Sequence, residues 1–199
     1  MNAPSKAELR QQALQRRAAL PKELRQRFSE QICSLVLAHP WVREAAIVHS
    51  YFSFGTEVDT HTLCQRLLDL GKRVAVPIVV EGQPELLHAW LRLPLRLRYN
   101  RWGIPEPDVP PTEWMTAEAL GLSPADVVIV PVVAYDRQLY RLGYGQGYYD
   151  RFLRRVRARR VGLAFSVQAV GFIPHAPHDV QLDVVITESG PLYADDIPP

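Results

Sequence analysis

The stretch VVIVPVVAYDRQLYRLGYGQGYYDRFL, residues 127–153, contains a strand, a glycine-rich loop and the start of a helix. Val127 to Pro131 is a short β-branched run that ends at a proline, which is typical of a strand buried on both faces. Gly143, Gly145 and Gly147 recur at every second position, where glycine permits positive φ and close approach of the backbone. Helical spacing follows. Strand, loop and helix in this order are typical of ligand binding in α/β proteins.

The chemistry of this loop favours a phosphate ligand. Backbone N–H groups can crowd around an anion where no Cβ interferes, and a helix N-terminus adds partial positive charge. Arg141 can pair with phosphate oxygens, and Asp150 in the first helical turn is placed to meet a magnesium ion on the same phosphates. A plain tight turn is the alternative for alternate glycines.

Two common phosphate loops are excluded. In a dinucleotide fingerprint the glycines begin at the strand end and an acid follows about twenty residues later, but here a longer segment intervenes and the neighbours of Val167 are not acidic. In a Walker loop the last glycine precedes a lysine, whereas Gly147 precedes Tyr148. The sequence therefore predicts a nucleotide polyphosphate site of neither type.

Composition limits the class of protein. The chain has 199 residues, of which 47% are hydrophobic and 22% charged, as expected for one globular domain over residues 1–199. A formal net charge of +2 favours neither a nucleic-acid nor a membrane partner. Cys33 and Cys64 are isolated thiols, and the N-terminal residues contain no apolar signal run, so we expect a cytoplasmic protein. We also expect a monomer.

Patterns along the chain predict alternating helices and strands. Ser5 and Glu8 form a capping box that starts a helix from Lys6 to Leu20. Further helices are expected over residues 21–38, 60–70 and 112–121, and strands over 45–54, 72–79, 86–93, 124–131, 161–166 and 184–187. A strand, a helix and a strand in succession imply a right-handed parallel unit. The expected fold class is α/β, with three layers: a mostly parallel sheet and helices on both faces.

Other candidate site residues each have a plainer interpretation. Lys6 and Arg10 share one helix face and could clamp a phosphate chain, or they form a solvated surface. Glu57 follows the first strand, where α/β sheets bind ligands, or it is a loop acid in solvent. Trp102 in a proline-rich loop could stack on a flat ring or simply anchor the loop.

Two charged groups near the C-terminal half need separate treatment. Asp179 and Asp183 precede the last strand, and one of them could reach a metal ion held by Asp150. The basic cluster from Arg154 to Arg160 could suggest RNA binding. Because cations suit the last turn of a helix and no aromatic residues are interleaved, we expect no nucleic-acid partner.

Several segments, taken in order, resemble those of the 5-formyltetrahydrofolate cyclo-ligase family over nearly the whole chain. They are Lys6 with Arg10, Tyr51 to Thr60, WGIPEP, VPVVAYD, RLGYGQGYYDRFL, GLAFSVQ and PHDVQLDVVITE. The resemblance implies ATP-dependent conversion of 5-formyltetrahydrofolate to 5,10-methenyltetrahydrofolate through an iminium phosphate. ADP and phosphate are the other products.

The resemblance also implies roles for individual residues. Magnesium is implied at Asp150 and Asp183, and contacts with the folate substrate are implied at Phe52, Glu57, Trp102 and Tyr148. The implied ATP site consists of Lys6, Arg10, Arg141, Leu142, Gly143, Tyr144, Gly145, Gln146, Gly147, Tyr148 and Tyr149. Among these residues, the cations Lys6, Arg10 and Arg141 are expected to take part in catalysis.

The chain departs from the family pattern at three positions. Leu139 replaces the usual glycine, Tyr144 stands where arginine is frequent, and Gln146 replaces a small residue. Loss of an arginine removes one cation facing the phosphates, so phosphate affinity or turnover could differ. Two alternatives therefore stay open: a phosphate-binding module of the same fold with altered catalysis, and a sugar-phosphate isomerase or related α/β enzyme, which would not need ATP.

Overall fold

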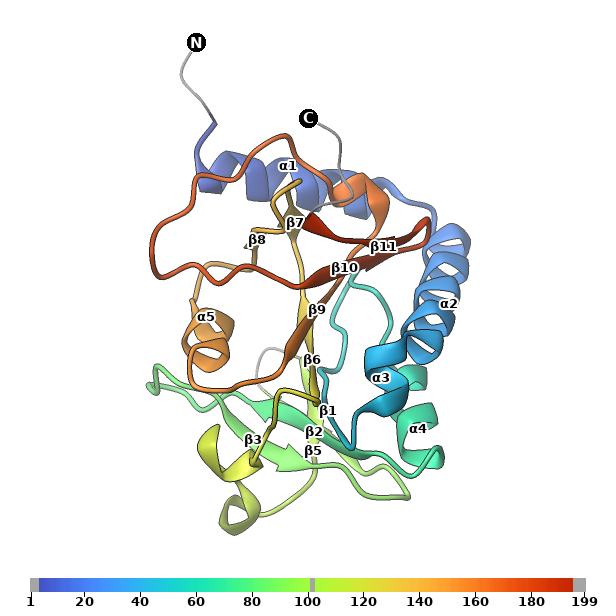
Figure 1. Cartoon of the computed structure of the whole chain (residues 1–199), viewed down its shortest axis with the longest axis vertical. Coiled ribbons are helices and arrows are strands. Elements are labelled where there is room, and N and C mark those ends of the chain that lie inside the picture. The colour runs from blue at the N-terminus through green and yellow to red at the C-terminus, as the bar shows by residue number, and fades with distance from the viewer. Residues whose placement is uncertain (1–3, 101–102, 195–199) are drawn as a thin grey trace.

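The computed structural model describes residues 4–100 and 103–194, which form layers around a seven-stranded sheet (Figure 1). The strand order is β11-β10-β9-β6-β1-β2-β3. The bounds are β1 Ile47–His49, β2 Arg73–Ile78, β3 Leu87–Trp90, β6 Val127–Pro131, β9 Arg159–Leu163, β10 Val184–Thr187 and β11 Gly190–Leu192. The inner strands β10, β9, β6, β1 and β2 are parallel, and the edge strands β3 and β11 are antiparallel to their neighbours. The prediction of a mostly parallel sheet is confirmed.

Helices cover both faces of this sheet. They are α1 Lys6–Ala19, α2 Lys22–Ala38, α3 Pro40–Glu44, α4 His61–Asp69 and α5 Tyr148–Leu153, with 3-10 turns η1 Pro111–Glu113, η2 Glu118–Leu120 and η3 Ser166–Gln168. Figure 1 shows α2, α3 and α4 on one side of the sheet, α5 on the other, and α1 across one end. No helix among the described residues is long and apolar enough to cross a membrane.

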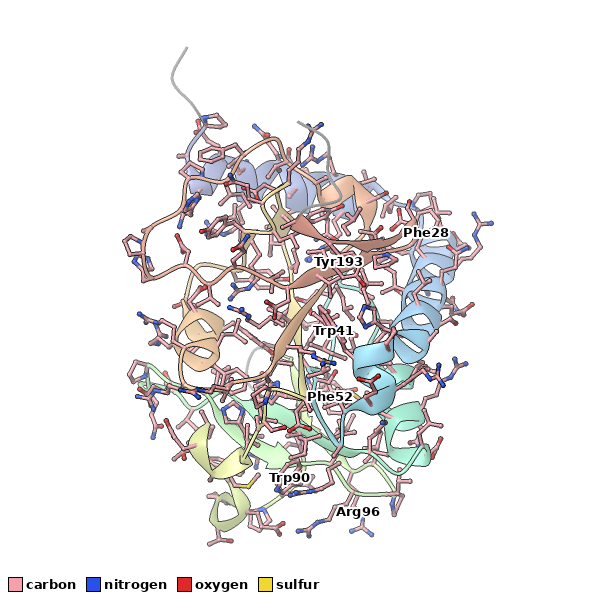
Figure 2. All side chains as sticks on the ribbon, in the orientation of Figure 1. Phe28, Trp41, Phe52, Trp90, Arg96 and Tyr193 are labelled. Carbon is pink, nitrogen blue, oxygen red and sulfur yellow. The ribbon has the colours of Figure 1, made fainter. Side chains whose placement is uncertain are left out.

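The position of β6 at the centre of the sheet explains why its sequence is apolar throughout. Val127 and Ile129 pack in the core beneath α2, α3 and α4, whereas Val128 and Val130 pack in the core that contains Phe152 of α5. Alternate side chains of a strand point to opposite faces, so a strand covered on both sides needs apolar residues at every position. Aromatic side chains labelled in Figure 2 complete the first core: Phe52 is part of it, and Phe28, Trp41 and Tyr193 pack against it.

The first helix, α1, brings N-terminal residues into contact with residues from the second half of the chain. The capping box of Ser5 and Glu8 is formed as predicted. Leu9 and Ala13 pack against Leu142 in a small separate core. Leu142 belongs to a hairpin of β7 Ala134–Tyr135 and β8 Arg141–Leu142, which fills the long interval between β6 and the glycine loop. The sequence did not predict this hairpin.

Three element predictions are wrong. The first strand ends at His49, since the following residues turn away into a loop in which Ser53 N donates to Thr60 Oγ1 at 3.0 Å. Residues 112–121 do not form the predicted helix. Two 3-10 turns occupy this region, because Met115 between them exchanges backbone hydrogen bonds with His88. The basic cluster does not end a helix: α5 stops at Leu153, and Arg159 and Arg160 belong to β9.

A second antiparallel pair covers the end of β2. Strands β4 Leu97–Tyr99 and β5 Pro105–Pro107 form it, on either side of the proline-rich loop. A cavity of about 380 Å³ lies beneath, lined by residues 78–81 and 98–100, Glu106 and Trp114. Because β2 and β1 are parallel neighbours, the residues after β2 that line this cavity leave the sheet at the same edge as the loop that contains Glu57.

Candidate functional site

The glycine loop has a backbone that other residues could not adopt easily. Gly145 and Gly147 have φ angles of 100° and 69°, in the left-handed region that favours glycine. A Cβ at Gly147 would lie 2.8 Å from Nη1 of Arg151, and one at Gly145 would lie 3.6 Å from the guanidinium of Arg10. The loop therefore offers bare backbone next to cations, which suits an anion.

The three predicted cations gather around this loop. Arg10 donates from Nε to the carbonyl oxygen of Gly143 at 2.6 Å, although the two residues are 133 positions apart. Arg141 is 8% exposed and donates from Nη1 to Asp150 Oδ1 at 3.1 Å. Lys6 lies one helical turn before Arg10 and pairs with Asp179 at 2.6 Å. The fold thus brings together positive charge from both ends of the chain.

The two predicted aspartates, Asp150 and Asp183, have different contacts. Asp150 Oδ1 accepts from the backbone N–H of Val180 at 3.1 Å. The segment that contains Asp179, the residue before Val180, therefore approaches the start of α5, where Asp150 lies. By contrast, the Asp183 carboxylate accepts from N, Nε and Nη2 of Arg160 at 2.7, 3.1 and 2.8 Å, where β9 and β10 begin. These contacts place Asp183 in a structural ion pair.

The electrostatics of Asp179 suit a metal ligand. Burial opposes ionisation, but the hydrogen bond from Lys6 and that from the Ala176 backbone outweigh it and lower the pKa of Asp179. No cluster of three or more His, Cys, Asp or Glu side chains among the described residues could hold a metal ion. Magnesium usually takes only one or two carboxylates, with water and phosphate as its other ligands. Asp150 and Asp179 are therefore candidate ligands.

The loop after β1 places Glu57 beside the glycine loop. Glu57 is half-buried, and its Oε2 accepts from the N–H of Phe54 at 2.8 Å. Burial raises the pKa of Glu57, while the Phe54 N–H, the charge of Arg17 and a hydrogen bond from Tyr144 act in the opposite direction. Arg17 donates both to Thr56, the neighbour of Glu57, and to Tyr144, which lies between two loop glycines, so it links the Glu57 loop to the glycine loop.

Sequence reasoning missed Arg17. This residue is 3% exposed, and it donates from Nε to Thr56 Oγ1 at 3.0 Å and from Nη2 to the Tyr144 hydroxyl at 2.9 Å. A helical projection could have found it, because Arg17 follows Arg10 by two turns and shares its face.

The predicted aromatic contacts have different surroundings. Phe52 is buried in the core with its ring centroid 5.1 Å from that of His61. Tyr148 donates from its hydroxyl to the Gln83 carbonyl at 3.3 Å. Trp102 lies outside the described residues. Phe54, which was not predicted, is 43% exposed, and one of its ring carbons lies 3.6 Å from the position of a Cβ on Gly103.

The rest of the predicted loop residues support its shape. Leu142 is buried beneath α1, and the Gln146 carbonyl accepts from Nη2 of Arg151 at 2.9 Å. The hydroxyl of Tyr149 is buried without a hydrogen-bond partner in the described part of the chain. Leu139, which replaces the family glycine, has a φ of 60° and is fully buried. A left-handed φ at this position explains why glycine is suited to it.

A parallel sheet with a glycine loop, cations and acids beyond its carboxyl edge defines an α/β enzyme of the phosphate-binding class. The chain belongs to the 5-formyltetrahydrofolate cyclo-ligase family, whose model matches residues 2–188. The resemblance drawn from the ordered motifs is thereby confirmed.

Curated relatives and solved structures agree with this family. The chain is 35% identical to 5-formyltetrahydrofolate cyclo-ligase of Escherichia coli K12, over 88% of this chain and 96% of the relative. It is 30% identical to a probable 5-formyltetrahydrofolate cyclo-ligase of Caenorhabditis elegans, over 96% and 97%. The structure of 5,10-methenyltetrahydrofolate synthetase from Aquifex aeolicus has a TM-score of 0.74 and 31% identity, covering 98% of this chain and 95% of that one.

Proposed function

We propose that this enzyme cyclises 5-formyltetrahydrofolate to 5,10-methenyltetrahydrofolate and converts ATP to ADP and phosphate. The observation that supports this most directly is the position of Arg17, which donates to Thr56, the neighbour of Glu57, at 3.0 Å and to the hydroxyl of Tyr144 in the glycine loop at 2.9 Å. A phosphate site and an acid suited to a pterin ring are thereby adjacent, as transfer of a phosphoryl group from one ligand to the other requires.

The proposed reaction has two steps. The formyl oxygen attacks the γ-phosphorus of ATP, a P–O bond forms, and the bond to ADP breaks. The neighbouring anilino nitrogen then attacks the formyl carbon, loses its proton, and expels the phosphorylated oxygen as phosphate. The first step mainly requires oxygen and phosphorus in line and neutralisation of developing charge.

The cations around the loop supply that neutralisation. Arg10 and Lys6 extend from one face of α1 toward the loop, and Arg141 lies beneath it. Each is held by an oxygen acceptor of the protein, at Gly143, Asp179 and Asp150 respectively. Cations fixed in advance need little reorganisation when charge develops, so they stabilise the transition state more than mobile ones.

Asp150 and Asp179 would hold the magnesium ion. When bound, the ion neutralises charge on the phosphate oxygens. This assignment replaces Asp183 with Asp179, because three nitrogen atoms of Arg160 already donate to the Asp183 carboxylate at the start of β9 and β10. It also keeps one of the two aspartates that precede the last strand, as the sequence suggested.

Glu57 would bind the pterin. An ionised carboxylate accepts hydrogen bonds from an amino group and a ring N–H at once. Phe54, three residues before Glu57, is exposed and Tyr148 is partly exposed, so both have ring area available to cover a pterin. The proposed enzyme is a cytoplasmic monomer, in keeping with the free, buried thiols of Cys33 and Cys64.

The test is to mix the protein with ATP, magnesium and 5-formyltetrahydrofolate. We expect methenyltetrahydrofolate and ADP to appear in equal amounts, and neither above a protein-free control when ATP is omitted. Binding of ATP without turnover would instead favour a catalytically altered module. Turnover of a sugar phosphate without ATP would favour the isomerase alternative.

A further inference from the structure

Arg17 of α1 contacts both of the loops that the proposed function assigns to ligands. Its Nε donates to Oγ1 of Thr56, the neighbour of Glu57, at 3.0 Å. Its Nη2 donates to the hydroxyl of Tyr144 in the glycine loop at 2.9 Å. The guanidinium therefore lies where the loop of the proposed folate-binding acid meets the loop of the proposed phosphate site.

Arg17 continues a line of cations on the first helix. It follows Lys6 by about three helical turns and Arg10 by about two, so the three side chains project from one face of α1. Arg10 reaches the carbonyl oxygen of Gly143 at 2.6 Å, and Arg17 reaches the next residue of the loop, Tyr144. Of these three cations, only Arg17 is buried.

The guanidinium of Arg17 has more donors than its protein contacts use. The residue is 3% exposed, and Nη1 is buried without a hydrogen-bond partner among the described residues. A guanidinium carries five N–H groups, and the bonds to Thr56 and Tyr144 use only two of them. A residue that merely joined two loops would need no more than these two, and every further buried donor lowers stability. The unused donors therefore indicate an acceptor on a ligand.

The charge of Arg17 also acts on the folate side of the site. Burial raises the pKa of Glu57, and the positive charge of Arg17 opposes that rise. An acid and a cation that influence each other in this way lie near the same point. A group that moves between the nucleotide and the folate would pass close to both.

The side chain of Tyr144 covers this guanidinium without being held in a core. Its ring centroid lies 6.0 Å from Arg17 Cζ, and the residue is 50% exposed. Displacement of this ring would leave Nη1 and Nη2 as two parallel donors, while Nε stays on Thr56. Two parallel donors match two oxygens of a phosphate group, which a single ammonium group cannot do.

We propose that Arg17 is a catalytic residue: Nη1 and Nη2 donate to oxygens of the phosphoryl group as this group passes from ADP to the formyl oxygen. The inference rests on the proposed function, which assigns ATP to the glycine loop and folate to Glu57. A buried guanidinium that Thr56 holds in advance stabilises charge developing in the transition state more than a solvated cation does.

The experiment separates catalysis from binding in variants of Arg17. Formation of methenyltetrahydrofolate gives kcat and the KM for folate, and titration with magnesium and adenylyl imidodiphosphate, a non-hydrolysable ATP analogue, gives a nucleotide Kd. Arg17→Gln should lower kcat by about 10²–10³ and change the KM and the Kd less than about threefold, because the contact strengthens in the transition state. Arg17→Lys keeps the charge without the two parallel donors, and its kcat should fall about tenfold.

Chemical rescue tests whether the missing group is the guanidinium itself. Arg17→Ala leaves space for a small planar cation, so millimolar guanidinium chloride should raise its kcat about tenfold or more. Urea at the same concentration is the control, because it has a similar shape and no charge, and it should leave kcat unchanged. Equal effects of the two compounds would contradict a role for the cation.

Two further variants distinguish catalysis from a structural link. Thr56→Val breaks the same connection between the loops and keeps the cation, so its kcat should fall less than about fivefold. Arg16→Gln, at the neighbouring exposed position, should change each constant less than about twofold. A higher KM or Kd with unchanged kcat in Arg17→Gln, or an equal loss of kcat in Thr56→Val, would show that Arg17 only joins the loops.

The remaining outcomes are also decisive. Thermal unfolding shows which variants fold, and if Arg17→Gln does not, Arg17→Lys decides the case: an unchanged kcat in that variant would overturn the role of the two parallel donors. Absence of product with the unaltered protein would instead overturn the proposed function on which this inference rests.

Discussion

The two ends of the parallel strands differ in how their buried polar groups are satisfied. At the amino edge, the Asp126 carboxylate accepts from Ile47 N at 2.8 Å and from both N and Oγ of Ser123. Burial opposes ionisation of Asp126, but these hydrogen bonds outweigh it and lower its pKa. Asp183 is engaged as fully by Arg160. The amino edge thus uses its acids to hold loops and strands together.

The carboxyl edge leaves polar atoms without partners. In the described part of the chain, Arg17 Nη1, His49 Nδ1 and the Tyr149 hydroxyl are buried there and unpaired. At the amino edge, Arg159 Nη1 also lacks a hydrogen-bond partner among the described residues. However, it lies 3.6 Å from the Glu44 carboxylate and forms an ion pair with it. Buried polar groups are normally satisfied, so a concentration of exceptions indicates a site prepared for ligands.

The strongest test of this contrast compares the acids near the loop. Asp150→Asn, Asp179→Asn and the double variant should each lower kcat by about 10²–10³, because the proposed site assigns both carboxylates to one magnesium ion. High magnesium should partly restore the single variants. The measurement is steady-state turnover over a series of magnesium concentrations.

Additivity decides the outcome. Losses in log kcat that add fully in the double variant, with no response to magnesium, would show that Asp150 and Asp179 have separate roles. Asp183→Asn is the matched control, and its kcat should stay within about twofold of the unaltered protein.

Glu57→Gln tests the folate side of the same edge. A hydrogen bond to a charged group is worth about 1.5–3 kcal/mol, so the folate KM should rise by roughly one to two decades. The KM for ATP should change less than about twofold, because the proposed site assigns Glu57 to folate and not to ATP. Equal increases in both values would mean that Glu57 only supports the loop.

The buried histidines near the carboxyl edge predict a pH dependence of stability. His49 Nε2 and His88 Nδ1 lie 3.0 Å apart, and burial lowers the pKa of His88 from 6.5 to about 4. The unfolded chain therefore binds a proton that the folded chain does not in this range. The contribution of the neutral His88 to the free energy of unfolding is fully present above about pH 6.5. It is lost as the pH falls toward 4, by up to roughly 3 kcal/mol.

Urea unfolding at pH 7.5 and at pH 5 measures this loss. His88→Gln should reduce the difference between the two pH values, and His178→Gln, at an exposed position, should leave it unchanged. If the stability difference between the two pH values persisted in full in His88→Gln, other groups would have to cause it.

Asp183→Asn should affect stability rather than activity. The variant loses the charge that Arg160 engages at the start of β9 and β10. Because both side chains are about one-third exposed, solvent screening limits the expected cost to about 1–2 kcal/mol. Urea unfolding measures it, and unchanged stability with lost turnover would return Asp183 to the active site.

Leu139 gives the smallest and most specific effect. At its φ of 60°, glycine is favoured over alanine, so Leu139→Gly should be more stable than Leu139→Ala by about 1 kcal/mol. Both should be less stable than the unaltered protein, since the leucine is buried. At Leu163 in β9, with ordinary strand geometry, the alanine variant should be the more stable of the two. If the glycine and alanine variants had the same order of stability at both sites, backbone strain at Leu139 would be contradicted.

The sequence determined the features that depend on neighbouring residues. The capping box at Ser5, the apolar run of β6 and the order of strands and helices follow from local geometry and hydrophobic period. The glycine loop and its flanks were specific enough to indicate the family. Errors occurred where tertiary contacts override local preference, as at Met115, which pairs with His88 and interrupts a predicted helix.

Only the tertiary structure decided which charged residues share a partner. Lys6 meets Asp179 across 173 positions, and Arg10 meets Gly143 across 133, because α1 packs against the hairpin before the glycine loop. Spacing in the sequence favoured Asp183 and Asp179 equally, yet across these few residues Asp179 pairs with Lys6 of α1 and Asp183 pairs with Arg160 of β9. Local sequence sets dihedral angles and period, whereas distances between side chains depend on how distant elements pack.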